Sequence, residues 1–383
     1  MANGTAEHDR TQGAAPSVEE FAATARQWLA AHAPQAPRDY GAILPPELAD
    51  EGRRWQRRLF EAGFAGVAWP SEYGGRGLSP EHASAWITEC ALAQVPPFLN
   101  MVGCVLTGSA LLAFGTAEQK QAHLRPIITG ERIWCQLFSE PDAGSDLASL
   151  SCSAVRDGDH YVVNGQKVWC SNGRVADWGI LMARTDPGAR HKGISFFLLD
   201  MRSEGVQTRP LRQMNGEAEF DEVFLTEVRI PVANLLGPEN EGWNVGMSAL
   251  TNERGYIGAS GISLKRRLDA MLSPGASLDP LQRQELVALW ARGTALWAMG
   301  RRQGPTASVL GSLAKLGTTE LMYDHAVFVA ELEGPASMLD SPAATALLSA
   351  PGARIAGGTS QIQRNIIAER ILGLPKEPRD AVP

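Results

Sequence analysis

The sequence predicts an α+β fold in which a helical block, a β block and a second helical block follow one another along 383 residues. Apolar residues recur every three or four positions before about residue 130 and again after residue 237, which is typical of helices. Between these stretches, paired turn residues and short apolar runs indicate strands. The chain is also longer than one compact core usually holds. We therefore expect a disordered tail at residues 1–16 and domains at residues 17–130, 131–236 and 237–383.

The first helical block is indicated by stripes of apolar side chains at helix spacing. One such stripe consists of Phe21, Ala25, Trp28 and Leu29. A glycine-rich loop at residues 69–77 interrupts the block, but its glycines do not follow a strand in the pattern Gly-x-Gly-x-x-Gly. The sequence therefore gives no support for a nicotinamide-binding Rossmann site.

The β block is indicated first by its turns. Asp157-Gly158 and Asn164-Gly165 are dipeptides typical of β-hairpins, so we expect a hairpin at each. The expected strands include residues 161–163, 167–171, 193–200 and 222–226. This interpretation gives roughly seven or eight short strands.

The second helical block is expected to open with one long helix. A single face of this helix would carry Trp243, Met247, Leu250, Ile257 and Leu264. Two later stretches are also amphipathic and rich in Ala and Leu, namely residues 279–301 and 308–332.

Composition argues against several classes of function. A net charge of −7 disfavours nucleic acid or an anionic membrane as the main partner, and no apolar run approaches the roughly 20 residues that span a bilayer. The seven histidines are scattered, without HxxxH or CxxC spacing, so no metal site is expected. The five cysteines lie in apolar or strand-like settings, which favours buried reduced thiols and a cytoplasmic location.

The segment that says most about function is residues 354–370. Its Gly357-Gly358 turn leads into a helix that Thr359 or Ser360 would cap. Backbone N–H groups at such a helix start point outward, with the positive end of the helix dipole behind them. The segment therefore suits an anionic or strongly polarised ligand.

Two segments of the β block carry residues that could hold a ligand. Residues 134–146 form a strand that runs into a turn of Gly, Ser and Asp, for which a plain surface turn is the simpler interpretation. In residues 167–173, strand alternation places Trp169 and Ser171 on one face. An indole stacked on a flat cofactor with a hydroxyl beside it is chemically sensible, whereas the core of the sheet is the alternative place for Trp169.

The helical stripe after residue 242 contains a carboxylate. Glu253 lies three positions after Leu250 and four before Ile257, so helix geometry places it inside the apolar stripe. A carboxylate there is either paired with Arg254 or another cation, or desolvated with a raised pKa. A raised pKa suits a general base, while an ordinary charge at the edge of the helix face is the alternative.

The three motifs at residues 134–146, 167–173 and 354–370 together resemble the acyl-CoA dehydrogenases, a family of flavoproteins. The resemblance extends over nearly all of residues 18–374. It implies a middle domain like a β-barrel or β-sandwich, a C-terminal four-helix bundle, and FAD as the cofactor. The residues that it assigns to FAD are Gln136, Phe138, Ser139, Ser145, Trp169, Ser171, Thr359 and Gln361, with Arg283 as a substitute for a missing arginine motif.

The resemblance also implies a role for several of these side chains. Trp169 would shield one face of the flavin, and Ser171 would bond the ring near N5. Ser145 would reach either the FAD pyrophosphate or the phosphopantetheine of the substrate. Thr359 and Gln361 would bind FAD across a subunit interface, which implies at least a dimer.

The chemistry that the resemblance implies is removal of an α-proton from an acyl-CoA thioester while the β-hydride passes to flavin N5, which gives a trans-2-enoyl-CoA. In many family members the base is a glutamate at the position of Gly357, and in others it lies at the position of Glu253, followed by an arginine as here. We therefore expect Glu253 to be the base, Gly357 N–H to hold the thioester carbonyl, and Arg254 to contact the substrate. The expected electron acceptor is an electron-transfer flavoprotein.

Two departures from the family pattern concern the adenine end of FAD. Residues 272–280 replace the usual Arg-x-x-Phe-Gly motif, and residues 333–337 replace the usual Gln-x-x-Gly-Gly element. Both changes fit subfamilies in which unlike chains share active sites, so a dimer, a homotetramer and a hetero-oligomer with a related chain all stay open. A non-catalytic partner subunit and a flavin oxidase or monooxygenase of the same fold are the alternative functions.

Overall fold

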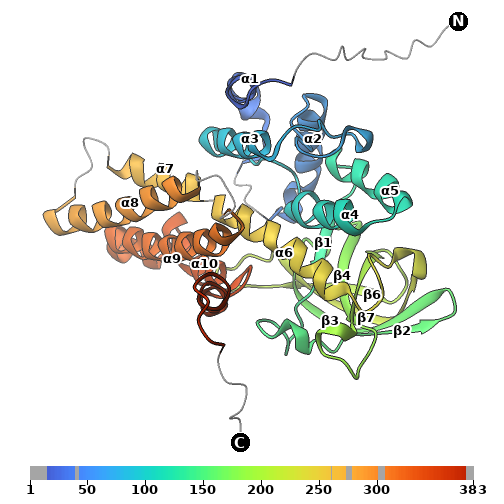
Figure 1. The fold of residues 1–383 in the computed structure, drawn as a ribbon. Helices are drawn as coiled ribbons and strands as arrows, with labels where there is room; N and C mark the ends of the chain where they lie inside the picture. The colour runs from blue at the N-terminus through green and yellow to red at the C-terminus, as the bar shows by residue number, and fades with distance from the viewer. Residues whose placement is uncertain (1–14, 39–42, 260, 273–277, 301–306, 377–383) are drawn as a thin grey trace, which may run out of the picture.

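The computed structural model describes residues 15–38, 43–259, 261–272, 278–300 and 307–376. The side chains of residues 252–259, 300 and 307–309 lie outside this description. An N-terminal set of helices, a seven-stranded sheet and a C-terminal set of helices follow one another, as Figure 1 shows. The predicted α+β fold and its order of blocks are confirmed, while the expected domain limits stay predictions. Most of the tail expected at residues 1–16 lies outside the described residues.

The N-terminal helices are α1 (Val18–His32), α2 (Ala49–Glu61), α3 (Pro80–Ala93), α4 (Gly108–Phe114) and α5 (Ala117–Ile128), with a π-helix, η4 (Val102–Thr107), directly before α4. Ser17 caps α1. Its hydroxyl accepts a hydrogen bond from Glu20 N–H, while the Glu20 carboxylate accepts from Ser17 N–H. The predicted stripe of Phe21, Ala25 and Leu29 is buried against α2 and α3.

The strands of the sheet are β1 (Trp134–Leu137), β2 (Ser153–Asp157), β3 (His160–Ser171), β4 (Trp178–Arg184), β5 (Ile194–Asp200), β6 (Val206–Leu211) and β7 (Phe220–Pro231). Their order is β1-β4-β2-β3-β7-β6, and β5 pairs with β4. Strand alternation sends Ile180 and Phe196 into a core shared with the helices, and Leu181 and Phe197 into a core on the opposite face. β4 and β5 are therefore buried on both faces.

The hairpin predicted at Asp157-Gly158 is confirmed, because β2 and β3 are antiparallel and Asp157 pairs with His160. The strand predicted over residues 193–200 corresponds to β5, and the one predicted over residues 222–226 lies within β7. Sequence patterns thus located these strands to within a few residues.

The second predicted hairpin, at Asn164-Gly165, is wrong, because β3 continues through both residues. The pairing of β3 with β7 shifts register between Val163 and Gly165, so the dipeptide forms a bulge rather than a turn. A Cβ at position 165 would lie 2.7 Å from Cys152 Sγ. The close approach of β2 therefore requires glycine there.

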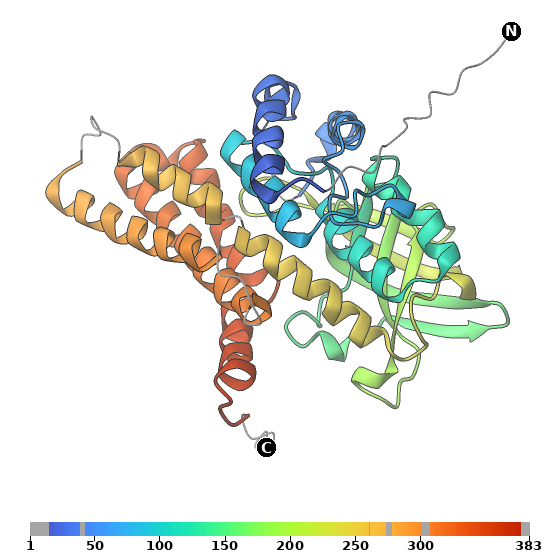
Figure 2. The same cartoon turned by 45° about the horizontal axis from the view of Figure 1, so that its top comes forward.

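The C-terminal helices are α6 (Gly242–Ala259), α7 (Gly261–Met271), α8 (Pro280–Gly300), α9 (Ala307–Glu333), α10 (Pro342–Ile355) and α11 (Ser360–Ile366), followed by a π-helix, η9 (Ile367–Ile371). α6 leads from the sheet to the bundle formed by α7, α8, α9 and α10 (Figures 1 and 2). The amphipathic stretches predicted over residues 279–301 and 308–332 correspond to α8 and α9.

The prediction of a single helix from Trp243 through Leu264 is wrong, since Leu264 lies in α7 rather than α6. Residue 260, between the two helices, is outside the described part of the chain. Gly261 begins α7 where α9 passes close, because a Cβ there would lie 3.1 Å from Thr318 Oγ1. Apolar periodicity continues across this junction, so the pattern alone did not reveal it.

All five cysteines are free, and Cys90, Cys135, Cys152 and Cys170 are buried, as the sequence predicted, whereas Cys104 is partly buried. Burial raises the pKa of the Cys152 thiol to about 11. Among the helices that the structure describes, none combines the length and the apolar character needed to cross a bilayer.

Candidate functional site

The structure brings together the two β segments that the sequence singled out. Val168 N–H, in β3, donates a hydrogen bond of 2.9 Å to the carbonyl oxygen of Ser139, which follows β1. Trp169 therefore lies next to the exit of β1 although thirty positions separate it from Ser139 in the sequence. The end of β3 and the turn after β1 form one continuous region, called the β-edge site below and comprising residues 136–145 and 167–171.

Trp169 is the most unusual residue of the β-edge site. Its φ is +58°, in the left-handed region that non-glycine residues rarely adopt, and its side chain is 54% exposed. The pairing of β3 with β7 shifts register between Lys167 and Cys170, which creates the bulge that turns the indole outward. The ring centroid lies 5.8 Å from that of Phe220, edge to face. The alternative of Trp169 in the core of the sheet is thus wrong.

Four polar side chains of the β-edge site make no hydrogen bond with any residue that the structure describes. They are Gln136, Ser139, Ser145 and Ser171. Ser145 is exposed, and the other three are partly buried. An exposed indole in the same region as amide and hydroxyl groups that no described residue binds fits a flat, polar cofactor such as a flavin. Within the described residues, no cluster of His, Cys, Asp or Glu could hold a metal ion.

Phe138 differs from its neighbours in the β-edge site. Its side chain is only 3% exposed and packs edge to face on Phe196, with the ring centroids 5.6 Å apart. The expected contact of Phe138 with a cofactor stays a prediction. The ring anchors the end of β1 in the core shared with the helices.

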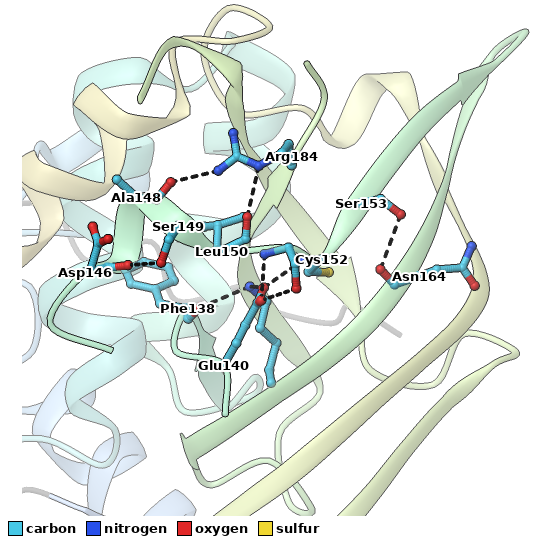
Figure 3. A network of polar contacts seen from close by, with 12 residues as sticks. Phe138, Glu140, Asp146, Ala148, Ser149, Leu150, Cys152, Ser153, Asn164 and Arg184 are labelled. Atoms are coloured by element: carbon cyan, nitrogen blue, oxygen red, sulfur yellow. Dashed lines mark hydrogen bonds and ion pairs between the residues drawn. The ribbon is translucent and has the colours of Figure 1, made fainter. Parts of the chain in front are cut away.

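The segment that follows Ser145 is held by Arg184 of β4. The guanidinium donates to the carbonyl oxygens of Leu150 at 2.9 Å and Ala148 at 2.8 Å (Figure 3). Ser149 Oγ donates to the carbonyl oxygen of Asp146 at 2.7 Å and closes the turn. Arg184 and Ser149 therefore fix the backbone directly after Ser145.

The C-terminal glycine loop has the predicted form. Gly357 and Gly358 have φ values of +64° and +94°, and Thr359 caps α11 by accepting from Ile362 N–H at 3.2 Å. Gln363 Nε2 donates to the carbonyl oxygen of Gly357 at 3.0 Å. The loop carbonyl is therefore turned toward α11, where it is paired.

A buried lysine fixes the other carbonyls of this loop. Lys315 of α9 has no solvent exposure, and its ammonium donates to the carbonyl oxygens of Arg354 at 3.2 Å and Gly358 at 2.7 Å. Bonding of these carbonyls to α9 defines the path of the backbone on both sides of Gly357. Neither Lys315 nor Gln363 was singled out from the sequence.

Glu320 of α9 binds the hydroxyl and charged groups around the start of α11. It accepts from Ser360 Oγ at 2.5 Å, and it forms ion pairs with Arg354 at 2.9 Å and Arg364 at 3.9 Å. Burial favours the neutral acid, but the Ser360 hydrogen bond and the two arginines outweigh this effect, so the pKa of Glu320 is lowered. Ser360 therefore binds α9, while Thr359 is the cap.

The remaining predicted residues lie on three helices of the C-terminal block, α6, α8 and α11. Glu253 and Arg254 fall in α6, but their side chains lie outside the described part of the structure. Gln361 is exposed on α11, which packs against α9. Arg283 is exposed on α8, which lies on the side of the bundle remote from the sheet (Figures 1 and 2).

A separate cavity lies away from all of these residues. It measures about 900 Å³, and its walls come from residues within 34–38, 45–51 and 215–219 and from Arg174, Thr345 and Ser349. None of the predicted site residues lines it.

Sequence models of three family domains match the chain. They are "Acyl-CoA dehydrogenase, N-terminal domain" at residues 16–131, "Acyl-CoA dehydrogenase, middle domain" at residues 135–228 and "Acyl-CoA dehydrogenase, C-terminal domain" at residues 281–372. Among curated proteins, the chain is similar to "Acyl-CoA dehydrogenase IpdE1" of Mycobacterium tuberculosis. The identity is 37% over 381 residues, which cover 94% of this chain and 99% of that protein.

Solved structures show the same likeness over the whole chain. The "Tcur3481-Tcur3483 steroid ACAD" is 28% identical with a TM-score of 0.82, covering 95% of this chain and 99% of that one. The "ChsE4-ChsE5 complex from Mycobacterium tuberculosis" is 29% identical with a TM-score of 0.77, covering 96% of this chain and 100% of that one.

Proposed function

The chain belongs to the acyl-CoA dehydrogenase family, and from this membership we propose that Glu253 removes the α-proton of an acyl-CoA thioester. The protein is an acyl-CoA dehydrogenase, an oxidoreductase that acts on CH–CH groups, and its cofactor is FAD. The proposed product is a trans-2-enoyl-CoA.

The observation that best supports this function is the β-edge site. Trp169 offers an exposed side chain, and Gln136, Ser139 and Ser171 of the same site offer polar groups that no described residue binds. We assign these residues, together with Ser145, to the cofactor. FAD, when bound, supplies the acceptor for the β-hydride. The role of the protein there is to orient a flat ring and to satisfy its polar edge.

The assignment of the base rests on α6. Val245 and Ala249 are fully buried and Leu250 packs on the core shared with the sheet, so one face of α6 is apolar. Position 253 continues this stripe by helix spacing, four after Ala249 and three after Leu250. Desolvation of a carboxylate at an apolar helix position would raise its pKa, as a base for a thioester α-proton needs. Gly357 offers no carboxylate for this task.

Gly357 is proposed to act through its backbone. Its N–H precedes the start of α11, while the carbonyl oxygens of Gly357 and Gly358 are bound by Gln363 and Lys315. A positioned N–H stabilises negative charge as it develops on the thioester oxygen, and this needs no side chain. Arg254, next to the proposed base, is assigned to substrate binding.

The substrate class and the assembly are proposed from relatives. One related structure is named a "steroid ACAD", so we infer that this chain accepts a bulky, polycyclic acyl group. Two related structures carry paired names, and one is called a complex. We therefore infer that a related chain completes the FAD site, where Thr359, Gln361 and Arg283 would contact the cofactor of a neighbour. An electron-transfer flavoprotein is the proposed acceptor of electrons.

A non-catalytic partner subunit is the second candidate. It is favoured by the glycine at position 357, which offers no carboxylate. Production of the chain alone, and together with a related chain, separates the two functions. A yellow protein that bleaches with an acyl-CoA under anaerobic conditions supports the enzyme. A colourless chain in both preparations contradicts it.

The base is tested by Glu253→Gln in the FAD-loaded protein. The variant should slow flavin reduction about 10²–10⁴-fold while FAD stays bound, because only proton removal is lost. Glu285→Gln, at an exposed position of α8, is the matched control and should reduce at the wild-type rate. Reduction of the Glu253→Gln variant at a near wild-type rate excludes Glu253 as the base. Titration with straight, branched and steroid side-chain thioesters then identifies the substrate class.

A further inference from the structure

A buried ion pair joins Lys167 of β3 to Glu140, which follows β1. Lys167 Nζ lies 2.8 Å from Glu140 Oε1, and the side chains are 0% and 5% exposed. The same ammonium donates to the carbonyl oxygen of Phe138 at 3.0 Å. One lysine therefore holds both residues that flank Ser139.

The Glu140 carboxylate also accepts hydrogen bonds from the segment before β2 (Figure 3). Its Oε2 accepts from the N–H and the hydroxyl of Ser151 at 2.7 Å and 2.8 Å, and its Oε1 accepts from Cys152 N–H at 2.9 Å. Burial favours the neutral acid, but the charge and hydrogen bond of Lys167 and the two backbone N–H groups outweigh it and lower the pKa of Glu140. Loss of either partner would leave an unpaired charge in the interior.

These contacts connect strands that the sheet itself does not connect. β4 and β2 lie between β1 and β3 in the strand order, so no ladder of backbone hydrogen bonds joins β1 to β3. The turn after β1 reaches β3 through three contacts, namely Lys167 with Phe138, Lys167 with Glu140, and Val168 N–H with Ser139. We call these three contacts the β1–β3 clamp.

The clamp also accounts for the conformation of Trp169. The register shift with β7 falls between Lys167 and Cys170, where Val168 N–H binds Ser139 instead of continuing the ladder. A left-handed tryptophan is strained and persists only where its surroundings over-determine the backbone. The clamp supplies that constraint from the residue directly before Trp169.

We propose that the Lys167–Glu140 pair is a positioning device that sets the place of the Trp169 indole relative to Ser139. It thereby shapes the surface that receives the cofactor ring. The role of the clamp in positioning Trp169 does not depend on the proposed function. The effect of the clamp on FAD binding rests on the function proposed above. Lys167 and Glu140 are positioning residues, because they act through Trp169 and Ser139.

Three variants test this proposal. Lys167→Met removes both bonds from the ammonium, and Glu140→Gln neutralises the carboxylate while it keeps an oxygen that can accept from Lys167. The double variant removes both charges and leaves no unpaired buried charge. It therefore serves as the test if a single variant fails to fold. Glu89→Gln is the control, because it breaks an ion pair of similar length, Arg26–Glu89 at 2.7 Å, in the N-terminal helices, where the glutamate is buried and the arginine is exposed.

The first measurement needs no cofactor. The apoprotein is labelled with 5-fluorotryptophan, and the ¹⁹F resonance of Trp169 is assigned by its absence in Trp169→Phe. In Lys167→Met and in the double variant this resonance should shift or broaden, while the resonances of Trp28 and Trp86, which belong to the N-terminal core, should not move. In Glu89→Gln the Trp169 resonance should stay in place.

The second measurement uses FAD. The visible circular dichroism of bound flavin should change in Lys167→Met, and the dissociation constant of FAD should rise about tenfold or more. Glu140→Gln should show a smaller change, because its remaining bond to Lys167 partly restores the clamp. A Trp169 resonance that stays in place in both the single and the double variants overturns the proposal. So does a shifted resonance with unchanged flavin dichroism and affinity. A wild-type chain that binds no FAD refutes the proposed function instead, and the ¹⁹F result then decides the role of the clamp alone.

Discussion

The ammonium of Lys315 lies 2.7 Å from the carbonyl oxygen of Gly358, so a fully buried lysine of α9 holds the loop that precedes α11. The loop therefore owes its shape to a tertiary contact as well as to its glycines. Its carbonyls are bound by Lys315 and Gln363, which fixes the backbone directly before α11.

Lys315→Met should destabilise the protein and weaken catalysis. A buried carbonyl left without a donor costs about 1–3 kcal/mol, and the Arg354 carbonyl would lose its bond to Lys315 while Gly358 keeps a longer one from Gln363, so we expect the free energy of unfolding to fall by about 1–3 kcal/mol. Urea denaturation measures this change. Lys192→Met, at an exposed position, is the control and should change stability by less than about 0.5 kcal/mol. Equal stabilities of the two variants would show that Lys315 does not hold the loop.

Trp169→Gly should separate cofactor binding from stability. The position has a φ of +58°, so glycine removes strain of about 1–2 kcal/mol, which offsets the lost contact with Phe220. The apoprotein should therefore unfold at nearly the wild-type urea concentration, whereas the FAD dissociation constant should rise about tenfold. Trp243→Gly is the contrasting variant. Because Trp243 packs on the core shared with the sheet, its loss should cost about 3–5 kcal/mol. A large loss of stability in Trp169→Gly would contradict the assignment of the indole to a ligand.

Gly357→Ala and Gly352→Ala should have effects of opposite sign on stability. Gly357 has a φ of +64°, where an L-residue costs about 1–2 kcal/mol, so Gly357→Ala should lower the free energy of unfolding. Gly352 lies inside α10 with no atom within 4 Å of an added Cβ. Alanine should stabilise that helix by about 0.5–1 kcal/mol. Thermal unfolding of both variants checks the signs, and a stabilised Gly357→Ala would rule out the left-handed loop.

Stability should fall as the pH decreases from about 7.5 to 5, in part through His123. Burial and the nearby Arg132 lower the pKa of His123 to about 4. The pKa of His123 is lower in the folded protein than in the unfolded chain, where it is about 6.5. The stability that neutral His123 contributes is therefore fully present above about pH 6.5 and is lost as the pH falls toward 4. His123 should account for roughly 2 kcal/mol of the change between the two pH values. Denaturant unfolding at both values checks this.

The control for this pH effect is His123→Gln, which cannot titrate and should show a correspondingly smaller loss. The free energy of unfolding of this variant should still decrease somewhat with falling pH, because burial also lowers the pKa of His325 to about 4. If the variant and the wild type lose the same stability between the two pH values, His123 is not neutral in the fold.

The elements that the sequence predicted correctly are those set by local chemistry. The cap at Thr359, the hairpin at Asp157-Gly158 and the amphipathic helix α9 each follow from neighbouring residues. The order of the three blocks follows in the same way, because the period of apolar residues changes from helical to strand-like and back.

The parts that the sequence could not predict depend on partners distant in the chain. Asn164-Gly165 fits a hairpin as well as a bulge, and only the continuous pairing with β7 decides for the bulge. Lys167 and Lys315 belong to a residue type that usually stays at the surface, so their burial against backbone carbonyls was not foreseen. A weak signal existed for Lys167, since strand alternation puts it on the same face as Tyr161 and Val163, both of which are buried.

The burial of the cysteines gives the protein internal reporters of its own opening. Thiolates, not thiols, react with alkylating reagents, and burial raises the pKa of Cys104 to about 12 and that of Cys152 to about 11. A maleimide that modifies Cys152 must therefore wait until β2 separates from the core. The rate of its incorporation, followed by mass spectrometry, measures how often the sheet comes apart under native conditions. A bound cofactor that stabilises the closed sheet would slow this incorporation in proportion to its occupancy.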